Sequence, residues 1–156
     1  SYGGGASANL WSKFFSNLQL HEVELEEHAE CAIQWERSGQ GTVHLGNQED
    51  QDFLMSVVRK SGGNFSVVID DGGHTMHQQV STFKTLFPFM IPGGIYFIED
   101  MSYSYSLPYG GGVVNTPGTS IDMVKHLLDE LHCSYNGATC RDDILSIDCF
   151  REICAF

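Results

Sequence analysis

The sequence predicts an α/β fold, and one strand-helix-strand unit with parallel strands carries this prediction. The run from Phe65 to Ile69 is apolar and rich in β-branched residues, and the turn signal Gly72-Gly73 follows it, so we expect a fully buried strand. A second run of this kind spans residues 95–98. Between the two runs, apolar residues recur every three or four positions, which predicts a helix of about four turns. These residues are Met76, Val80, Phe83, Phe87 and Met90. Pro92-Gly93-Gly94 should end this helix, directly before the second run. A helical connection of this length makes the two strands parallel.

Both strands of this unit end in acidic residues. Asp70 and Asp71 follow the first strand, and Glu99 and Asp100 follow the second. Parallel strands send their carboxyl ends to one edge of the sheet, about 4.8 Å apart, so we expect these acids to share a crevice with His74. Crowded carboxylates need either a shared proton or a bound cation, and we favour the cation. Either acidic pair alone would be equally typical of a solvated turn.

The same segments resemble one known family, the macrocin and mycinamicin O-methyltransferases, a metal-dependent branch of the class I S-adenosylmethionine methyltransferases. The matching residues are Ile69-Asp-Asp-Gly-Gly-His74, Phe83, Leu86-Phe87-Pro88, Pro92-Gly-Gly94 and Ile98-Glu-Asp100. This resemblance implies a Rossmann-like, doubly wound sheet of the class I methyltransferase type, which is mostly parallel and closes with a C-terminal antiparallel hairpin. It also implies S-adenosylmethionine and a divalent metal as cofactors.

Upstream of the unit, a glycine cluster and an acidic residue indicate a cofactor site. Gly3, Gly4 and Gly5 precede a helical stripe of apolar residues, and glycines there let a ligand approach backbone N–H groups, although a flexible end is also typical of such a cluster. Residues 18–25 alternate as a strand does, and Glu24 lies 19 residues after Gly5, near the spacing of an acid that binds ribose. By resemblance, the glycine loop follows the first strand of the sheet, which is missing here. We therefore expect residues 1–156 to form a single, N-terminally truncated methyltransferase domain.

The middle of the chain continues the alternation of helices and strands. Residues 26–38 predict a helix, residues 42–45 a short strand, and residues 51–60 a helix that Asp50 caps. Between this strand and this helix, Asn47 and Gln48 follow the strand end. By resemblance they lie near the adenine of the cofactor, whose edge an amide can hydrogen-bond; an ordinary Gly-Asn turn is the alternative.

After Asp100, residues 101–119 lack a regular pattern and contain three tyrosines and three consecutive glycines. Long irregular segments in compact domains are often active-site lids, and tyrosines suit a sugar or aromatic acceptor. Simple disorder is the alternative. Ser120 should then cap a helix, and residues 144–149 and 152–156 predict the closing hairpin.

Composition restricts the class of function. At 156 residues the chain can form one domain, and its net charge of −12 argues against a nucleic-acid partner. We find no apolar run long enough to span a membrane and no signal peptide. The five cysteines are odd in number and form no Cys-x-x-Cys pair, so the sequence predicts neither a zinc knuckle nor a disulfide framework, but a reducing, cytoplasmic setting. A homo-oligomer stays open.

The resemblance implies an O-methyltransferase that acts on a hydroxyl of a small-molecule acceptor, such as a sugar or polyhydroxylated natural product. By the same resemblance, Asp71, Glu99 and Asp100 hold the metal, and His74 is the general base. Oxygen ligands favour magnesium over zinc. We assign Asp70 to the cofactor side of the site or to a structural role.

Other assignments stay open from the sequence. His77 is a second candidate for the base, and the remaining histidines are expected on the surface. A metal-dependent hydrolase or oxygenase could use the same acids with His74 and His77. A non-catalytic binding module with a degenerate methyltransferase fold is the alternative outside the enzymes.

Overall fold

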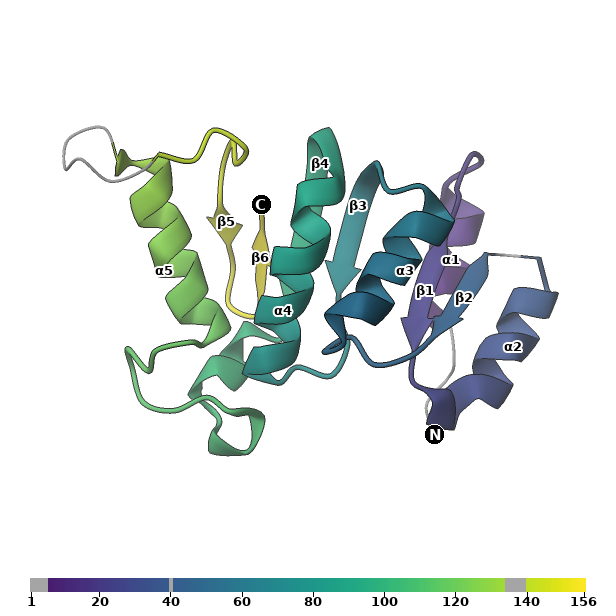
Figure 1. The fold of residues 1–156 in the computed structure, drawn as a ribbon, viewed down its shortest axis with the longest axis horizontal. Helices are drawn as coiled ribbons and strands as arrows, with labels where there is room; N and C mark the ends of the chain where they lie inside the picture. The colour runs from purple at the N-terminus through teal and green to yellow at the C-terminus, as the bar shows by residue number, and fades with distance from the viewer. Residues whose placement is uncertain (1–5, 40, 134–139) are drawn as a thin grey trace.

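The structure is a computed structural model that describes residues 6–39, 41–133 and 140–156. Helices and strands alternate along most of the chain (Figure 1). The α-helices are α1 (Ala6–Phe14), α2 (Ala29–Arg37), α3 (Gln51–Ser61), α4 (Met76–Leu86) and α5 (Ser120–Leu131). The strands are β1 (His21–Glu24), β2 (Thr42–Leu45), β3 (Phe65–Asp70), β4 (Met90–Glu99), β5 (Asp148–Cys149) and β6 (Ile153–Ala155). Four short 3₁₀ turns are η1 (Glu26–His28), η2 (Phe87–Phe89), η3 (Met101–Tyr105) and η4 (Leu107–Tyr109).

The strands form two sheets within the described parts of the chain. Strands β1 and β2 make a parallel pair, and the larger sheet has the order β3-β4-β6-β5. Strands β3 and β4 are parallel, with Asp70 opposite Ile98, and the closing hairpin of β5 and β6 is antiparallel. The predicted α/β fold, the parallel strand-helix-strand unit and the C-terminal hairpin are therefore confirmed.

Helix α4 ends earlier than the apolar periodicity predicts. The pattern extends to Met90, but the α-helix stops at Leu86, a 3₁₀ turn follows, and Met90 already pairs with Phe65 as the first residue of β4. Pro88 explains the stop, because proline has no N–H to donate to the preceding helical turn. Pro92, Gly93 and Gly94 consequently lie inside β4, where they cause an irregularity in the pairing with β3.

Strand β3 was predicted to be fully buried, but the structure shows that it is not. Its side chains alternate between a covered face, which carries Val68 and Asp70, and an open face, where Val67 is 51% exposed and Ile69 is 37% exposed. Helices α3, α4 and α5 cover one face of the large sheet and enclose the core with β4 (Figure 1). In the described residues, no helix covers the other face of β3 to the same extent, and this explains the exposure.

The core lies between those three helices and β4. Tyr96 and Ile98 of β4 are completely shielded from solvent, and Phe83 of α4 contacts the Tyr96 ring edge to face, with centroids 5.1 Å apart. Burying aromatic side chains of this size contributes strongly to stability, roughly 1.5–3 kcal/mol each. The packing of Ile98 fixes the end of β4, so Glu99 and Asp100 emerge from a rigid strand.

Several predicted element boundaries shift in the structure. Strand β1 is limited to four residues, and the helix predicted over 26–38 divides into η1 and α2. Asp50 caps α3 as predicted, because its carboxylate accepts hydrogen bonds from the N–H groups of Asp52 and Phe53. At the start of α5 the cap is Thr119 rather than Ser120, since the Thr119 hydroxyl accepts from the Asp122 N–H.

The structure pairs four of the five cysteines, which the sequence does not predict. Cys149 and Cys154 form a disulfide across the hairpin of β5 and β6, and Cys133 pairs with Cys140. The folded chain brings the Cα atoms of these pairs to 4.1 Å and 5.3 Å, a proximity that cysteine spacing alone does not reveal. The cytoplasmic setting stays a prediction. None of the helices in the described residues has the length and apolar character needed to cross a membrane.

Candidate functional site

Four parallel strand ends supply the candidate site. Glu24 ends β1, Asn47 and Gln48 follow β2, Asp70 ends β3, and Glu99 ends β4. Open α/β sheets bind ligands at the carboxyl ends of their strands, so each of these residues lies where a ligand is expected. The predicted glycine loop, Gly3 to Gly5, lies outside the described residues.

Asp71, His74 and Asp100 form a compact cluster at this edge. One ligand atom from each residue lies within 4.8 Å of the others, and His74 Nε2 is 3.3 Å from Asp100 Oδ2. The structure thus brings together two of the predicted metal ligands and the predicted base. The two carboxylates offer oxygen ligands that suit a divalent cation, and the imidazole lies beside them.

Glu99, the third predicted metal ligand, does not belong to this three-residue cluster. The charges of the cluster nevertheless act on its carboxyl group. Burial raises the pKa of Glu99 first, and the negative charges of Asp71 and Asp100 raise it further. A cation among these carboxylates would remove that repulsion. The electrostatics of Glu99 therefore fit a shared cation site, and its role as a ligand stays a prediction.

Two cluster residues have unusual backbone conformations. His74 has a φ angle of 57° and Asp100 a φ angle of 55°, both in the left-handed region that residues with a Cβ rarely adopt. Such conformations cost about 1–3 kcal/mol each and concentrate at functional sites. In this structure both lie at the point where the two side chains meet, so the backbone is arranged to direct them toward each other.

One face of the His74 ring is covered by an aromatic side chain. The ring stacks on Tyr103 with centroids 5.3 Å apart and planes inclined by 20°, and Tyr103 in turn contacts Tyr109. The Nδ1 atom is buried and has no hydrogen-bond partner among the described residues. Because Nδ1 is enclosed, Nε2 is the nitrogen that can reach a substrate. Tyr103 was not among the predicted site residues, and the only signal for it was its place in a tyrosine-rich segment.

Gln48, a predicted cofactor residue, uses its side chain inside the protein. Its Nε2 donates to Asp70 Oδ1 at 3.0 Å and to Thr82 Oγ1 at 3.1 Å, and its Oε1 accepts from the Gly73 N–H at 2.9 Å. A Cβ atom at Gly72 would collide with this amide, which explains the glycine there. Gln48 therefore clamps the loop between β3 and His74. Cofactor binding through its side chain would require breaking these bonds.

Asp70 is buried behind the cluster, with 4% of its surface exposed. Burial raises the pKa of Asp70 to about 6, although the hydrogen bond from Gln48 lowers it. Its Oδ2 has no partner among the described residues. This environment favours the structural role over contact with the cofactor, and the assignment to the cofactor side stays a prediction.

Glu24 and Asn47 remain at the surface of the edge. Glu24 is half-buried at the end of β1 and accepts a hydrogen bond from the Leu25 N–H. The Asn47 Oδ1 accepts from the Glu49 N–H, as in the ordinary turn that was the alternative to a purine contact. Neither observation tests cofactor binding, so both assignments stay predictions.

If Glu24 binds the ribose of the cofactor, Glu24→Ala should weaken cofactor binding by roughly 1.5–3 kcal/mol, the range for a hydrogen bond to a charged group. Calorimetric titration with S-adenosylhomocysteine measures this loss. Asp129→Ala on α5 is a suitable control, because it removes an exposed carboxylate from a helix that lies far from β1 (Figure 1). Equal affinities of wild type and Glu24→Ala would return Glu24 to the solvated surface.

His77, the second candidate for the base, points away from the cluster. Its side chain is 76% exposed, and its Nδ1 lies 3.8 Å from Glu49 Oε1. The described cluster contains His74 as its single histidine. A site with two histidines and one carboxylate, as a hydrolase or oxygenase would need, is therefore not assembled by these residues.

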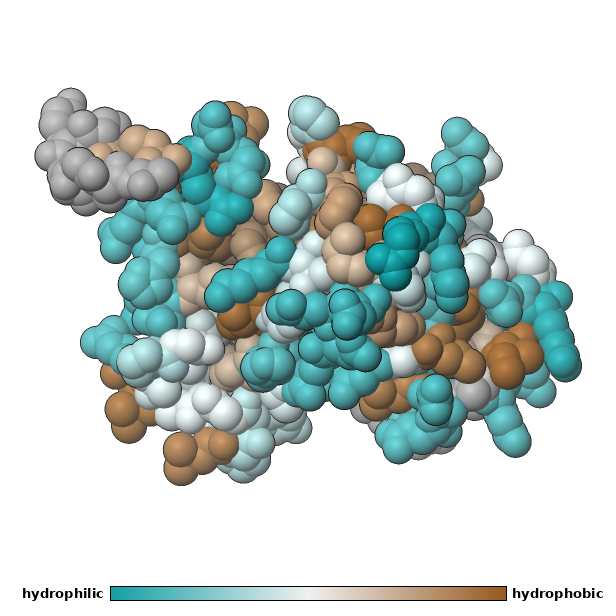
Figure 2. All heavy atoms as spheres, in the orientation of Figure 1, coloured by the Kyte–Doolittle hydropathy of each residue, from teal (hydrophilic) through white to brown (hydrophobic). Residues whose placement is uncertain are grey.

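The segment 101–119 is more ordered than predicted. It contains η3 and η4, and Met101 and Ser104 are buried. The N–H of Ile121 donates to the Ser104 hydroxyl at 3.2 Å, which ties the start of the segment to α5. Its apolar tips stay exposed, with Leu107 and Val113 each 80% exposed, and Figure 2 shows brown side chains at the lower left, where this segment lies.

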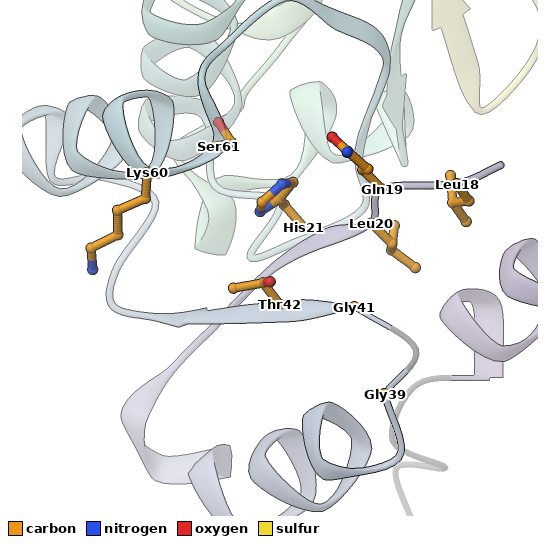
Figure 3. Close-up of a pocket in the computed structure, with 9 residues that line it drawn as sticks. All are labelled: Leu18, Gln19, Leu20, His21, Gly39, Gly41, Thr42, Lys60 and Ser61. Atoms are coloured by element: carbon orange, nitrogen blue, oxygen red, sulfur yellow. The ribbon is translucent and has the colours of Figure 1, made fainter.

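A separate pocket of about 460 Å³ lies at the opposite edge, near the amino ends of β1 and β2 (Figure 3). It is lined by Leu18, Gln19, Leu20, His21, Gly39, Gly41, Thr42, Lys60 and Ser61. None of the predicted site residues lines it. The pocket lies at the amino ends of the strands, whereas the cluster lies at their carboxyl ends, so we assign the pocket no part in the chemistry.

Near this pocket, His44 corrects the expectation that the remaining histidines are on the surface. It is 4% exposed, and its Nε2 lies 3.0 Å from Nδ1 of His21. Burial lowers the pKa of His44 from its ordinary value of 6.5, the charges of His21 and Lys60 lower it further, and Glu36 opposes them. The native state therefore favours neutral His44.

This shift predicts a loss of stability in acid. Because the folded pKa lies below the unfolded one, His44 contributes stability above about pH 6.5, and this contribution is lost as the pH falls through the folded pKa. Urea unfolding at about pH 7.5 and about pH 5.5 should show a smaller acid loss in His44→Leu than in wild type. The exposed His126→Leu is the control. An identical acid loss in wild type and His44→Leu would exclude this role of His44.

Profile models of protein families give no match to the chain. The chain is 36% identical over 137 residues to 8-demethyl-8-(2-methoxy-alpha-L-rhamnosyl)-tetracenomycin-C 3'-O-methyltransferase of Streptomyces olivaceus, covering 83% of this chain and 32% of that protein. It is 33% identical over 132 residues to demethylmacrocin O-methyltransferase of Streptomyces fradiae, covering 82% of this chain and 31% of that protein.

The fold agrees with these relatives. The solved structure of the MycE methyltransferase in complex with Mg, S-adenosylhomocysteine (SAH) and mycinamycin VI superimposes with a TM-score of 0.84 and 29% identity, covering 99% of this chain and 40% of that one. The chain belongs to the macrocin and mycinamicin O-methyltransferase-like family. The resemblance that the sequence predicts is thereby confirmed. This member of the family spans about a third of the length of the curated relatives that it matches.

Proposed function

We propose that the chain is part of an S-adenosylmethionine-dependent O-methyltransferase that uses a divalent metal, expected to be magnesium, to activate a hydroxyl of a small-molecule acceptor. The cluster of Asp71, His74 and Asp100 at the carboxyl edge of the parallel strands carries this proposal. Magnesium and S-adenosylhomocysteine in the similar MycE structure support the choice of cofactors.

The residues divide into two roles. Asp71, Asp100 and Glu99 would hold the cation, because carboxylate oxygens are the ligands that a hard dication prefers. When bound, S-adenosylmethionine supplies the methyl group on its sulfonium sulfur, and the cation lowers the pKa of the acceptor hydroxyl. His74 would remove the hydroxyl proton through Nε2, and its stacking on Tyr103 keeps the ring in one orientation. Alignment of the two substrates by this rigid edge supplies much of the rate.

The acceptor would lie between the cluster and the segment 101–119. That segment begins directly after Asp100, and its Tyr103 stacks on His74, so it borders the site. Exposed apolar side chains such as Leu107 and Val113 offer a surface for the apolar part of a glycosylated acceptor. One relative is named for methylation of a rhamnosyl tetracenomycin, which supports a sugar hydroxyl as the target.

Calorimetric titration and a methyl-transfer assay together test this function. The protein should bind S-adenosylhomocysteine, and should transfer radiolabelled methyl groups to rhamnosides only when magnesium is present. Binding of cofactor without any transfer to a broad panel of glycosides would favour the non-catalytic module. Failure to bind either cofactor or metal would exclude the proposal for this chain.

We also propose that an additional strand between β1 and β3 completes the domain. Among the described residues, β3 pairs only with β4, and β1 pairs only with β2, so each has an edge without a partner strand. Backbone amides on the open edges of β1 and β3 should then exchange rapidly with solvent in residues 1–156. Slow exchange at both edges would count against the additional strand.

A further inference from the structure

One buried amide connects the metal cluster to the helices behind it. Gln79 of α4 is completely shielded from solvent. Its Nε2 donates to the carbonyl oxygen of Glu99 at 2.8 Å, and its Oε1 accepts from the hydroxyl of Ser120 at 2.5 Å. Both groups of the amide are therefore satisfied, as a buried amide requires.

The bond to Glu99 controls the backbone of the next residue, Asp100. The Glu99 carbonyl and the Asp100 N–H belong to one planar peptide unit, so fixing the carbonyl fixes the plane that precedes Asp100. The plane that follows Asp100 is fixed as well, because the Met101 N–H donates to the carbonyl of Glu152 at 3.1 Å. Asp100 lies between these two planes, at φ 55° and ψ 40°.

The left-handed conformation of Asp100 needs such support. A residue with a Cβ disfavours this region, so the chain would relax away from it if one of the two planes were released. In this conformation the Asp100 carboxylate lies 3.3 Å from His74 and within the cluster with Asp71. Relaxation of the backbone would move the carboxylate away from both partners.

We propose that Gln79 is a positioning residue for the metal cluster, which fixes the Glu99–Asp100 peptide and thereby holds the Asp100 carboxylate against Asp71 and His74. The inference rests on the proposed function, because it takes the cluster as a divalent-cation site. Through Ser120, the same amide also connects the cluster to the residue that directly follows the segment 101–119.

Gln79→Met tests the proposal, because methionine has a similar length and no donor for the Glu99 carbonyl. Its affinity for Mn²⁺, measured by calorimetry in the absence of substrate, should fall about 10- to 100-fold, as is typical when a residue that orients a metal ligand is removed. Gln51→Met is the control for the same substitution on an exposed helix position, since the Gln51 amide donates to the Ser81 hydroxyl, outside the cluster. Its affinity for Mn²⁺ should equal that of wild type.

Two further variants separate positioning from a general loss of packing. Ser120→Ala keeps the bond between Gln79 and Glu99, so it should retain most of the Mn²⁺ affinity although it loses a buried hydrogen bond. In an Asp100→Ala background, Gln79→Met should cause no additional loss, because the ligand that it positions is absent. Additive losses in the double variant would overturn the proposal.

NMR of the metal-free protein supplies a readout that depends on neither metal nor activity. In wild type, scalar coupling between Gln79 Nε2 and the Glu99 carbonyl carbon should be detectable, and its absence would overturn the proposal even if Gln79→Met failed to fold. In Gln79→Met, the HN–Hα coupling of Asp100 should leave its left-handed value; if it did not, the proposal would also fail. If Asp100 moved but wild type bound no cation, positioning by Gln79 would stand and the proposed function would fail.

Discussion

Asp71→Ala is expected to abolish magnesium-dependent methyl transfer while leaving the fold intact. Asp71 is exposed and follows a strand end, so its removal should change the free energy of unfolding by less than about 0.5 kcal/mol. Its carboxylate is nevertheless one of the three cluster groups, and loss of a cation ligand removes several kcal/mol of charge stabilisation from the transition state, roughly a 10³-fold effect. Transfer assays with increasing magnesium, together with urea unfolding, measure both quantities.

A matched substitution separates this effect from a change in overall charge. Asp129 on α5 is exposed and distant in sequence from the cluster, and Asp129→Ala removes the same charge. That variant should retain wild-type activity. Glu99→Ala is expected to lose activity like Asp71→Ala if Glu99 is the third ligand. Full activity of wild type after treatment with a chelator would show that the metal has no part in the reaction.

The sequence predicts the site best where the order of strands and helices alone brings two residues together. Asp71 and Asp100 meet because β3 and β4 are parallel and adjacent, which the strand-helix-strand order already implies. The end of α4 was missed for the opposite reason. Phe87 still packs in the core after the helix has stopped, so apolar periodicity continued past Pro88, which marks the actual end.

Contacts between distant polar side chains were not predictable in the same way. Gln48 reaches Asp70 and Thr82 across 22 and 34 positions, and no local pattern encodes such a clamp. For Gln79 a signal did exist: a polar residue lies three positions after Met76 and four before Phe83, on the apolar face of α4. A buried amide there must find partners, and these are the Glu99 carbonyl, next to Asp100 of the cluster, and the Ser120 hydroxyl. The pairing of His44 with His21 depends likewise on the register of β1 and β2.

Substituting His74 should slow methyl transfer by a factor of about 10² or more, the contribution expected of a general base. Because His74 has a left-handed φ angle, which asparagine tolerates better than alanine, His74→Asn is the cleaner variant, and His74→Ala should show the same loss. Binding of S-adenosylhomocysteine should survive both changes, since the imidazole would act on the acceptor proton. His77→Ala, whose exposed ring lies beside Glu49 outside the cluster, should retain full activity. Normal turnover in His74→Asn combined with a large loss in His77→Ala would place the base one helical turn later.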